Sequence, residues 1–574
     1  MAHAVTATAA VRRAGWGLAA ALLLAAMVPS LEAAETSADS ASEAGPEERR
    51  FRRRTEPQEP PPPIVPSIDD RTTPPPAPPT PSGPAFLVRS IRLDGAPLIP
   101  EPVVRAAVAP LEGRTLTFAA LQRAAETLTQ WLRGRGWVTS RVSIPPQEVT
   151  DGVVTLRLLD GRVGAIRVDG ATHSRPARLV RRMQSRPGAL LDYRRLQTDL
   201  ARLNATPDRR VAAVLMPGLE PGTSDVVLTV EERSPLHVGY LAHNAGTRLS
   251  GRFRQGVTLG HNNLTGRDDQ LVARVEMSGR TGFLGTVVSY LLPIGASGRA
   301  LSVDASHADV QLGMQFRPRP IEGQATVLGI TWSEPILEAP TWEAEWTLGL
   351  DGKRIRSRED GSDRGKDDLR ILRTGPNWIQ QDARGRSIVT TELGIGFSRF
   401  LGSSRKVDPA ASRSQTGAQF VRFTAAGGRL QQLWGGFQLL LRGAWQWTND
   451  RLPPAEMLQI GGAETVRGYP QGEFLGDYGY VGTAELRAPL PWWRHRGKPT
   501  TYLAGFYDGG AAFLRKPLQT EEQQRRLQGV GVGLRWTVNP YTSAVLDLAL
   551  PVGDTSSSED EDRPRVHYAV TLGF

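Results

Sequence analysis

The segment that decides the fold is Gly-Gly-Ala-Glu-Thr-Val-Arg-Gly-Tyr, at residues 461–469. It is polar and glycine-rich, and it lies between two segments in which apolar and polar residues alternate, at residues 437–447 and 480–487. Such alternation gives a β-strand one apolar and one polar face. If the apolar faces meet lipid, the polar faces line a lumen, and the segment between the strands can fold inward and offer Arg467 to the lumen wall.

The same alternation recurs through the C-terminal part of the chain. At about ten residues per strand plus turns and longer loops, residues 234–574 hold about 16 strands. We therefore predict a transmembrane antiparallel β-barrel over this range, with polar loops at residues 352–387 and 402–417. The alternative is a large soluble β-sandwich, but it would leave the small residues on the polar parity unexplained.

The composition restricts the function classes. The chain has 574 residues and no cysteine, which excludes a disulfide scaffold and a thiolate metal site. Its interior contains no run of about 18 apolar residues, so helical membrane spans are not expected beyond the N-terminus. The formal charge is +10, but the arginines are scattered and no nucleic-acid-binding motif is present. We therefore predict no nucleic-acid partner, and assign these charges to solvated surface, lumen and rims near anionic lipid headgroups.

The N-terminal part has three sections. Residues 1–34 have a charged start, an apolar core and small residues after it, which is typical of a secretory signal; an uncleaved anchor is the alternative. Residues 35–55 include a charged block that can form a short helix or remain disordered. Residues 56–85 are a proline-rich, semi-extended linker.

Residues 86–161 and 162–233 form an internal repeat. Each copy has the pattern β-α-α-β-β, and the openings Ile-Arg-Leu-Asp-Gly at 91–95 and Ile-Arg-Val-Asp-Gly at 166–170 match. A small sheet with helices on one face has free edges, to which an extended chain can add by backbone hydrogen bonds. The repeats are therefore either polypeptide-binding modules or spacers that hold the barrel.

The Val-Arg-Gly-Tyr sequence at residues 466–469 resembles a signature of the outer-membrane assembly and secretion superfamily. In that family the segment is a loop tucked into a barrel, and its arginine pairs with an aspartate of the inner wall. The matching aspartate here is Asp508, within Phe-Tyr-Asp-Gly-Gly at 506–510. The alternative interpretation is a turn with a solvated arginine.

The resemblance assigns a gating role to this loop. An arginine fork and a carboxylate can pair through two hydrogen bonds, so Arg467 and Asp508 would lock the loop in its resting position. Gly468 would allow a tight turn, Tyr469 would pack its ring on the wall, and Val466 completes the motif.

Further candidates come from strand parity alone. Glu485 and Arg487 fall on the polar parity of the segment 480–487, so we expect their side chains to face the lumen, and the same holds for Asp547 in its own segment. Barrel-embedded proteases and lipases use such positions, which leaves a barrel hydrolase as an alternative. However, the HExxH, GxSxG and Walker patterns are missing from the sequence, and its eight histidines show no ligand spacing. We predict that the chain is not an enzyme, with no catalytic residue, cofactor or metal.

The order of the segments narrows the resemblance. The tandem repeats are similar to POTRA domains, and residues 263–271 resemble the first barrel hairpin of the TpsB-type transporters of two-partner secretion. That family typically has Asp-Asn before a glycine where this chain has His243-Asn244, a small departure. In these transporters an N-terminal helix plugs the barrel, so residues 35–55 become a candidate plug helix tied on by the linker.

The resemblance implies a location and a function. The protein would sit in the outer membrane of a Gram-negative bacterium with its POTRA domains in the periplasm, as a monomer or weak dimer. It would bind an unfolded adhesin, haemagglutinin or haemolysin through an N-terminal secretion domain of that partner, and thread it through the barrel to the surface. The alternatives are a factor that inserts other barrels, which belongs to the same superfamily, and a passive porin.

Overall fold

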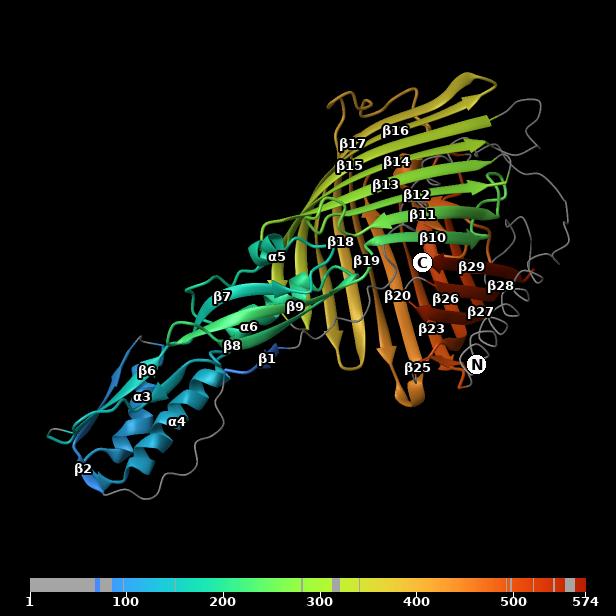
Figure 1. Ribbon diagram of the computed structural model, residues 1–574. Helices are drawn as coiled ribbons and strands as arrows, with labels where there is room; N and C mark the ends of the chain where they lie inside the picture. Colours follow the sequence, from blue (N-terminus) through green and yellow to red (C-terminus); the bar gives the residue numbers. More distant parts are fainter. Residues whose placement is uncertain are drawn as a thin grey trace, which may run out of the picture. The chain divides into compact units, whose positions relative to one another are not determined.

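The computed structural model describes most of the chain (Figure 1). The described residues are 68–72, 85–95, 98–149, 151–279, 282–311, 321–339, 341–491, 493–495, 498–519, 521–539, 542–552 and 563–573. The predicted signal segment 1–34 and the candidate plug helix 35–55 lie outside them, as does most of the linker 56–85. Over the described residues, the structure has no helix of the length and apolarity that a membrane crossing requires.

Sixteen antiparallel strands close into a barrel, which confirms the predicted fold class and strand number. Closure occurs where the last strand pairs with the first, through Gly239↔Gly573 and Tyr240↔Leu572. In ring order the strands are β10 (Leu236–His243), β11 (Arg254–His261), β12 (Gln270–Ser278), β13 (Phe283–Ile294), β14 (Arg299–Gln311), β15 (Ile321–Glu338), β16 (Trp342–Glu359), β17 (Ser362–Asp382), β18 (Gly385–Gly396), β19 (Phe420–Gln432), β20 (Gln438–Thr448), β23 (Tyr478–Pro489), β26 (Thr501–Phe513), β27 (Gln524–Asn539), β28 (Thr542–Pro551) and β29 (Arg565–Gly573).

The period of two in the sequence sets the two faces of the barrel wall. In β15, Ala325 and Val327 are buried on the inner face, whereas Leu328 and Ile330 are 54% and 49% exposed on the outer face. Alternate side chains of a strand point to opposite faces, so an apolar residue at every second position covers the outside of the barrel with hydrocarbon. This outer face is the surface expected to contact lipid.

One loop prediction was wrong. Residues 352–387, expected as a polar loop, are mostly strand, because β16 and β17 continue to a tight hairpin in which Glu359 faces Ser362. Asp360 and Gly361 form its turn, both with positive φ, at 51° and 76°. An Asp-Gly pair with two left-handed residues is a preferred two-residue hairpin turn. Toward this hairpin one face of β16 is rich in arginine, and its buried face mixes the polar Lys353 and Ser357 with Ile355, so the alternation typical of the other strands is missing.

The first repeat folds into an α+β module. Its three-stranded sheet has the order β3-β6-β5, and a core that includes Leu121, Leu128, Leu132 and Leu156 lies between helix α4 and that sheet. The helix has these leucines on one face because they are spaced at three to four residues. The elements of this module are β2 (Phe86–Val88), β3 (Ser90–Asp94), α3 (Glu101–Val108), η2 (Ala109–Leu111), β4 (Arg114–Leu116), α4 (Phe118–Gly134), β5 (Arg141–Ser143) and β6 (Val153–Leu159).

The second repeat has the same plan with one difference. Helix α6 begins at an N-cap, Asp192, whose side chain accepts hydrogen bonds from the backbone N–H groups of Arg194 and Arg195. The sheet has four strands rather than three, in the order β1-β8-β9-β7, because linker residues Ile68–Asp70 pair in parallel with β8. One of the two predicted free edges is therefore covered. The elements are β1 (Ile68–Asp70), β7 (Arg162–Asp169), α5 (Pro176–Arg182), α6 (Tyr193–Leu203), β8 (Arg209–Pro217) and β9 (Thr223–Glu232).

Several short elements lie in the connections between barrel strands. The longest described connection runs from residue 449 to 477, between β20 and β23, and we call it the inward loop. It contains η5 (Pro454–Glu456), β21 (Leu458–Ile460) and β22 (Phe474–Gly476). The remaining elements are η4 (Trp434–Gly436), β24 (Arg494–His495) and β25 (Lys498–Pro499).

Candidate functional site

The inward loop is a folded hairpin. Strands β21 and β22 pair in antiparallel register, with Ile460 opposite Phe474, and both contact barrel strand β26. Gly461 and Gly462, which begin the turn, have φ values of 96° and 103°, in the left-handed region that glycine adopts without strain. The glycine-rich sequence thus reverses the chain at the tip, where Val466 and Arg467 lie.

Arg467 is held by Asp508 of β26. The guanidinium donates from Nε to Asp508 Oδ2 at 2.6 Å and from Nη2 to Oδ1 at 2.9 Å, and the backbone N–H of Arg467 donates to Oδ2 at 3.1 Å. The guanidinium carbon also lies 3.3 Å from the ring centroid of Phe506. This is a bidentate arginine–carboxylate pair whose guanidinium lies over an aromatic ring. Such a geometry fixes the direction of the contact as well as its distance.

Further charges surround this pair. Arg467 Nη1 donates to Glu485 Oε2 at 3.0 Å and to Asp547 Oδ2 at 3.2 Å. Glu485 accepts from Arg487 Nε at 2.9 Å and from Arg535 Nη2 at 2.6 Å. Arg535 also bonds Asp547. The side chains come from β23, β26, β27 and β28, which are neighbours in the ring, and Arg467 itself binds three of these strands, β23, β26 and β28.

Burial and the neighbouring carboxylates shift the pKa of Arg467 in opposite directions. Burial alone would lower the pKa of this guanidinium, but the carboxylates of Asp508, Asp547 and Glu485 raise it above its ordinary value. Arg467 therefore stays cationic, and its attachment to the wall does not switch by deprotonation.

The neighbours of Arg467 fit the loop against the wall. Gly468 has a φ of 99°, and a Cβ there would lie 2.8 Å from the backbone of Leu550. Gly529 allows the same close approach from the other side, since a Cβ on it would lie 2.0 Å from the carbonyl oxygen of Arg467. Val466 and Tyr469 are buried in an apolar cluster with Leu458, Ile460, Ala512 and Leu527. Only glycine fits where the two backbones meet.

The structure thus brings together the residues singled out from the sequence: Val466, Arg467, Gly468, Tyr469, Glu485, Arg487, Asp508 and Asp547. Sequence reasoning missed Arg535 and the Phe506 ring. Arg535 lies on the polar parity of a strand whose other positions are Val532, Leu534 and Trp536, and an arginine at such a position was an available signal. Across the described residues, histidines and acidic side chains do not gather into any group of three or more that could hold a metal ion.

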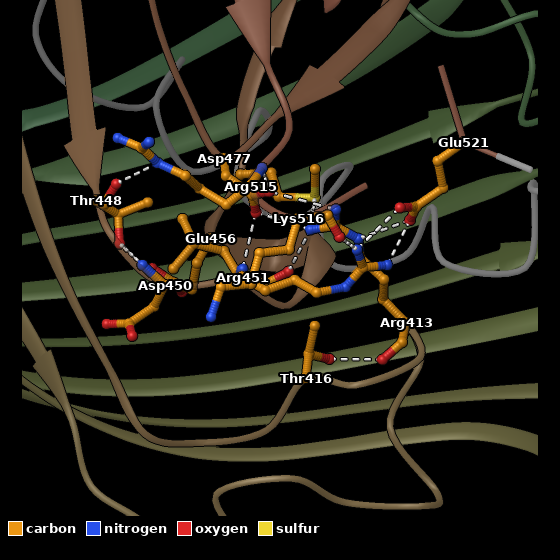
Figure 2. Close-up of polar contacts among 12 residues, drawn as sticks. Arg413, Thr416, Thr448, Asp450, Arg451, Glu456, Asp477, Arg515, Lys516 and Glu521 are labelled. Carbon is orange, nitrogen blue, oxygen red and sulfur yellow. Dashed lines mark hydrogen bonds and ion pairs between the residues drawn. The ribbon is translucent and has the colours of Figure 1, made fainter. Parts of the chain in front are cut away.

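A second charged network lies where the inward loop joins the barrel (Figure 2). Asp477 is fully buried and accepts from Arg413 Nη1 at 2.7 Å and from the backbone N–H of Arg515 at 2.7 Å. Glu521 accepts from Arg413 Nε at 3.2 Å and from Arg451 Nη2 at 2.6 Å. The network ties the two ends of the inward loop to the β18–β19 and β26–β27 connections. We call it the root network.

Glu521 lies outside the barrel strands, in the β26–β27 connection. Burial alone would raise the pKa of its carboxyl group, but hydrogen bonds from Arg451, the Leu518 N–H and Arg413 lower it below its ordinary value of 4.5. The ionised form is therefore the one that the root network stabilises.

Comparison with known proteins places the chain. Residues 222–536 match the family model described as haemolysin secretion/activation protein ShlB/FhaC/HecB, and residues 86–161 match the ShlB-type POTRA domain. The chain is 24% identical to the outer membrane transporter CdiB of Dickeya dadantii over 86% of its own length and 87% of that protein. It is 21% identical to the heme/hemopexin transporter protein HuxB of Haemophilus influenzae, over 78% and 80% of the two chains.

The fold agrees with this assignment. The solved structure of CdiB from Escherichia coli superposes with a TM-score of 0.71 at 21% identity, covering 95% of this chain and all of that one. The family model covers more than half of the sequence, including the inward loop and most of the barrel. The chain therefore belongs to the haemolysin secretion/activation protein family ShlB/FhaC/HecB.

Proposed function

We propose that the protein translocates one secreted partner protein across the outer membrane in a largely unfolded form. In this proposal residues 86–161 and 162–233 are periplasmic POTRA domains that capture the partner, and residues 234–574 are the conduit. The observation that carries it is the inward loop, held inside a sixteen-strand barrel by Arg467 and Asp508. A loop attached by exchangeable ion pairs can close a pore and also be displaced from it.

The partner would be an adhesin, haemagglutinin or haemolysin with an N-terminal secretion domain. Among the family relatives, proteins called CdiB, heme/hemopexin transporter HuxB and hemolysin transporter HpmB carry names of transport proteins. The partner's extended segments would add to a sheet edge, and in the described residues β3, β5 and β7 are end strands, while the β8 edge is taken by β1. We infer a monomer or weak dimer embedded in lipid, without nucleic acid, and without enzymatic activity of its own.

Gating would follow from the contacts of Arg467. In the resting state Arg467 and Asp508 keep the loop against β26, with Glu485 and Arg487 supporting the pair. Displacement of this loop, together with a plug formed by residues 35–55, would open the lumen for an extended chain. Folding of the partner outside the cell would supply direction.

Co-expression with a candidate partner, followed by assay of the medium, tests this proposal. Wild-type protein should release the partner, and deletion of residues 86–232 should abolish release while the barrel still inserts into the outer membrane. Arg467→Ala and Asp508→Ala should impair release or alter channel conductance. Normal export by the truncated protein would disprove the docking role, and an unchanged phenotype for both point variants would remove the lock. If the partner is retained and other outer-membrane barrels fail to insert, the protein is an assembly factor instead.

A further inference from the structure

A second charged contact holds the inward loop at Glu456, eleven positions before Arg467 in the chain. Glu456, in the single turn η5, is fully buried. Its Oε1 accepts from Lys353 Nζ of β16 at 2.6 Å, and its Oε2 accepts from Arg422 Nη1 of β19. Both carboxylate oxygens thus bind basic side chains of the barrel wall.

The barrel wall around Glu456 carries buried basic side chains that bind carboxylates. Arg422 also donates from Nη2 to Glu392 of β18 at 2.6 Å, and Arg373 of β17 donates to Asp351 of β16 at 2.7 Å. Lys353 and Arg422 are each 5% exposed, so they have little access to water and depend on their acidic partners. Removing Glu456 would leave two buried cations short of one negative charge.

Glu456 and Arg467 bind different parts of the barrel wall. In ring order Glu456 binds the seventh and tenth strands, β16 and β19, whereas Arg467 binds the twelfth, thirteenth and fifteenth, β23, β26 and β28. The inward loop is therefore attached to two separate arcs of the barrel wall.

We propose that Glu456 is a positioning residue that fastens the inward loop to the β16–β19 wall independently of Arg467, so that the lumen opens fully only when both fastenings release. This inference rests on the proposed gating role of the loop. It changes the expected effect of the Arg467 variants, since a loop freed at its tip is still held at Glu456, so Arg467→Ala alone raises the open fraction less than the double variant does. The contacts of Arg467 and those of Glu456 contribute separately to the stability of the closed state.

The absence of cysteine permits a direct test. Ala463→Cys, near the tip and half-buried, is introduced as a reporter for a membrane-impermeant maleimide, and conductance is recorded in planar bilayers. The compared full-length proteins carry Glu456→Gln, Lys353→Gln, Arg467→Ala, or Glu456→Gln with Arg467→Ala. Glu322→Gln, at an exposed position of β15, is the matched control. A difference in gel migration between unheated and heated samples verifies that each barrel is folded.

Each substitution at Glu456 or Lys353 should raise the open fraction about tenfold, since a hydrogen bond to a charged group is lost or weakened. The effect of the double variant Glu456→Gln with Arg467→Ala should equal the product of the two single effects, because the two contacts are independent. Glu322→Gln should match wild type. If Glu456→Gln leaves both conductance and labelling unchanged, alone and in the Arg467→Ala background, the inference is overturned.

Failure of the gating proposal would give a different pattern. The conductance measurement needs no secreted partner, so it is valid whether or not export is detected. If Arg467→Ala has no effect but Glu456→Gln and Lys353→Gln open the channel, the lock at the tip fails while the second fastening stands. If the four variants behave like wild type although all are folded, both fail.

Discussion

Asp508→Asn gives the most discriminating test of the site, because the substitution is nearly isosteric and removes one charge. Asp508 accepts three hydrogen bonds from Arg467, from Nε, Nη2 and the backbone N–H. An asparagine keeps one acceptor oxygen and presents an NH₂ group to a guanidinium that can only donate. The bidentate pair therefore loses one of its two side-chain hydrogen bonds, and the net charge of the site becomes more positive by one.

The magnitude follows from what Arg467 retains. Complete loss of the partner of a buried charge costs about 3–5 kcal/mol. Arg467 still has Glu485 and Asp547 at 3.0 and 3.2 Å, so the cost should lie at the lower end, about 3 kcal/mol. That value lowers the ratio of docked to undocked loop about 100-fold. Asp547→Asn removes a single, longer contact with Arg467 and should cost about 1.5 kcal/mol, or about tenfold.

The assay is the rate of maleimide labelling at Ala463→Cys in intact membranes, with Asp304→Asn of β14 as a matched control. Labelling should be fastest with Asp508→Asn, intermediate with Asp547→Asn, and unchanged in the control. Equal rates for Asp508→Asn and wild type would refute the reasoning, and so would a larger effect of Asp547→Asn, since the number of contacts would then not determine the order.

Three further outcomes follow from the contacts described. Gly468→Ala should undock the loop and raise conductance, because its Cβ would lie 2.8 Å from the Leu550 backbone, whereas Gly505→Ala, with open space at its Cβ, should behave like wild type in the same recording. Glu521→Gln should lower the melting temperature at neutral pH, and this difference from wild type should persist down to about pH 4.5 and vanish as the pH falls through the depressed pKa of Glu521, because both proteins are then uncharged at this position. If the difference grew in acid, the sign of the argument would be wrong. Asp269→Ala should destabilise the β11–β12 turn by about 1–3 kcal/mol in denaturant unfolding, because Asp269 is buried and accepts from the Thr265 N–H and the Tyr290 hydroxyl; a normal midpoint would contradict this role.

Prediction from the sequence succeeded where the local pattern of apolar and polar residues matches the place of each residue in the fold. Strand parity places Glu485 and Arg487 on the inner face, and the superfamily signature pairs Arg467 with Asp508 across 41 residues. Residues 352–387 were misassigned because hydrophobic alternation weakens there: one face is rich in arginine, and the buried face mixes the polar Lys353 and Ser357 with Ile355. The Asp-Gly turn at 360–361 was the overlooked local signal.

Two other structural features leave no signal in the sequence around them. The pairing of Ile68–Asp70 with β8 involves three residues of a proline-rich stretch, and it depends on Ile68 packing against the core of the second module. The contact between Glu456 and Lys353 joins residues 103 positions apart, and it exists only because the barrel closes around the loop. A lone glutamate in a loop is usually solvated, so only the three-dimensional path of the chain shows that this one is buried.

The ion pairs that hold the inward loop have a physical consequence for the gating proposed above. A buried salt bridge gains Coulomb energy but costs desolvation, so its net contribution to stability is small relative to the strength of the contact itself. When Arg467 and Glu456 leave their partners, water can solvate the loop residues and the wall residues that faced them, because the lumen fills as the loop departs. An apolar plug of the same size would expose hydrocarbon on both sides at about 25 cal/mol per Å² and would resist displacement. Under the proposed gating, paired charges therefore give a closed state that is defined in geometry yet reversible, which suits a pore that opens for a secreted protein and closes again.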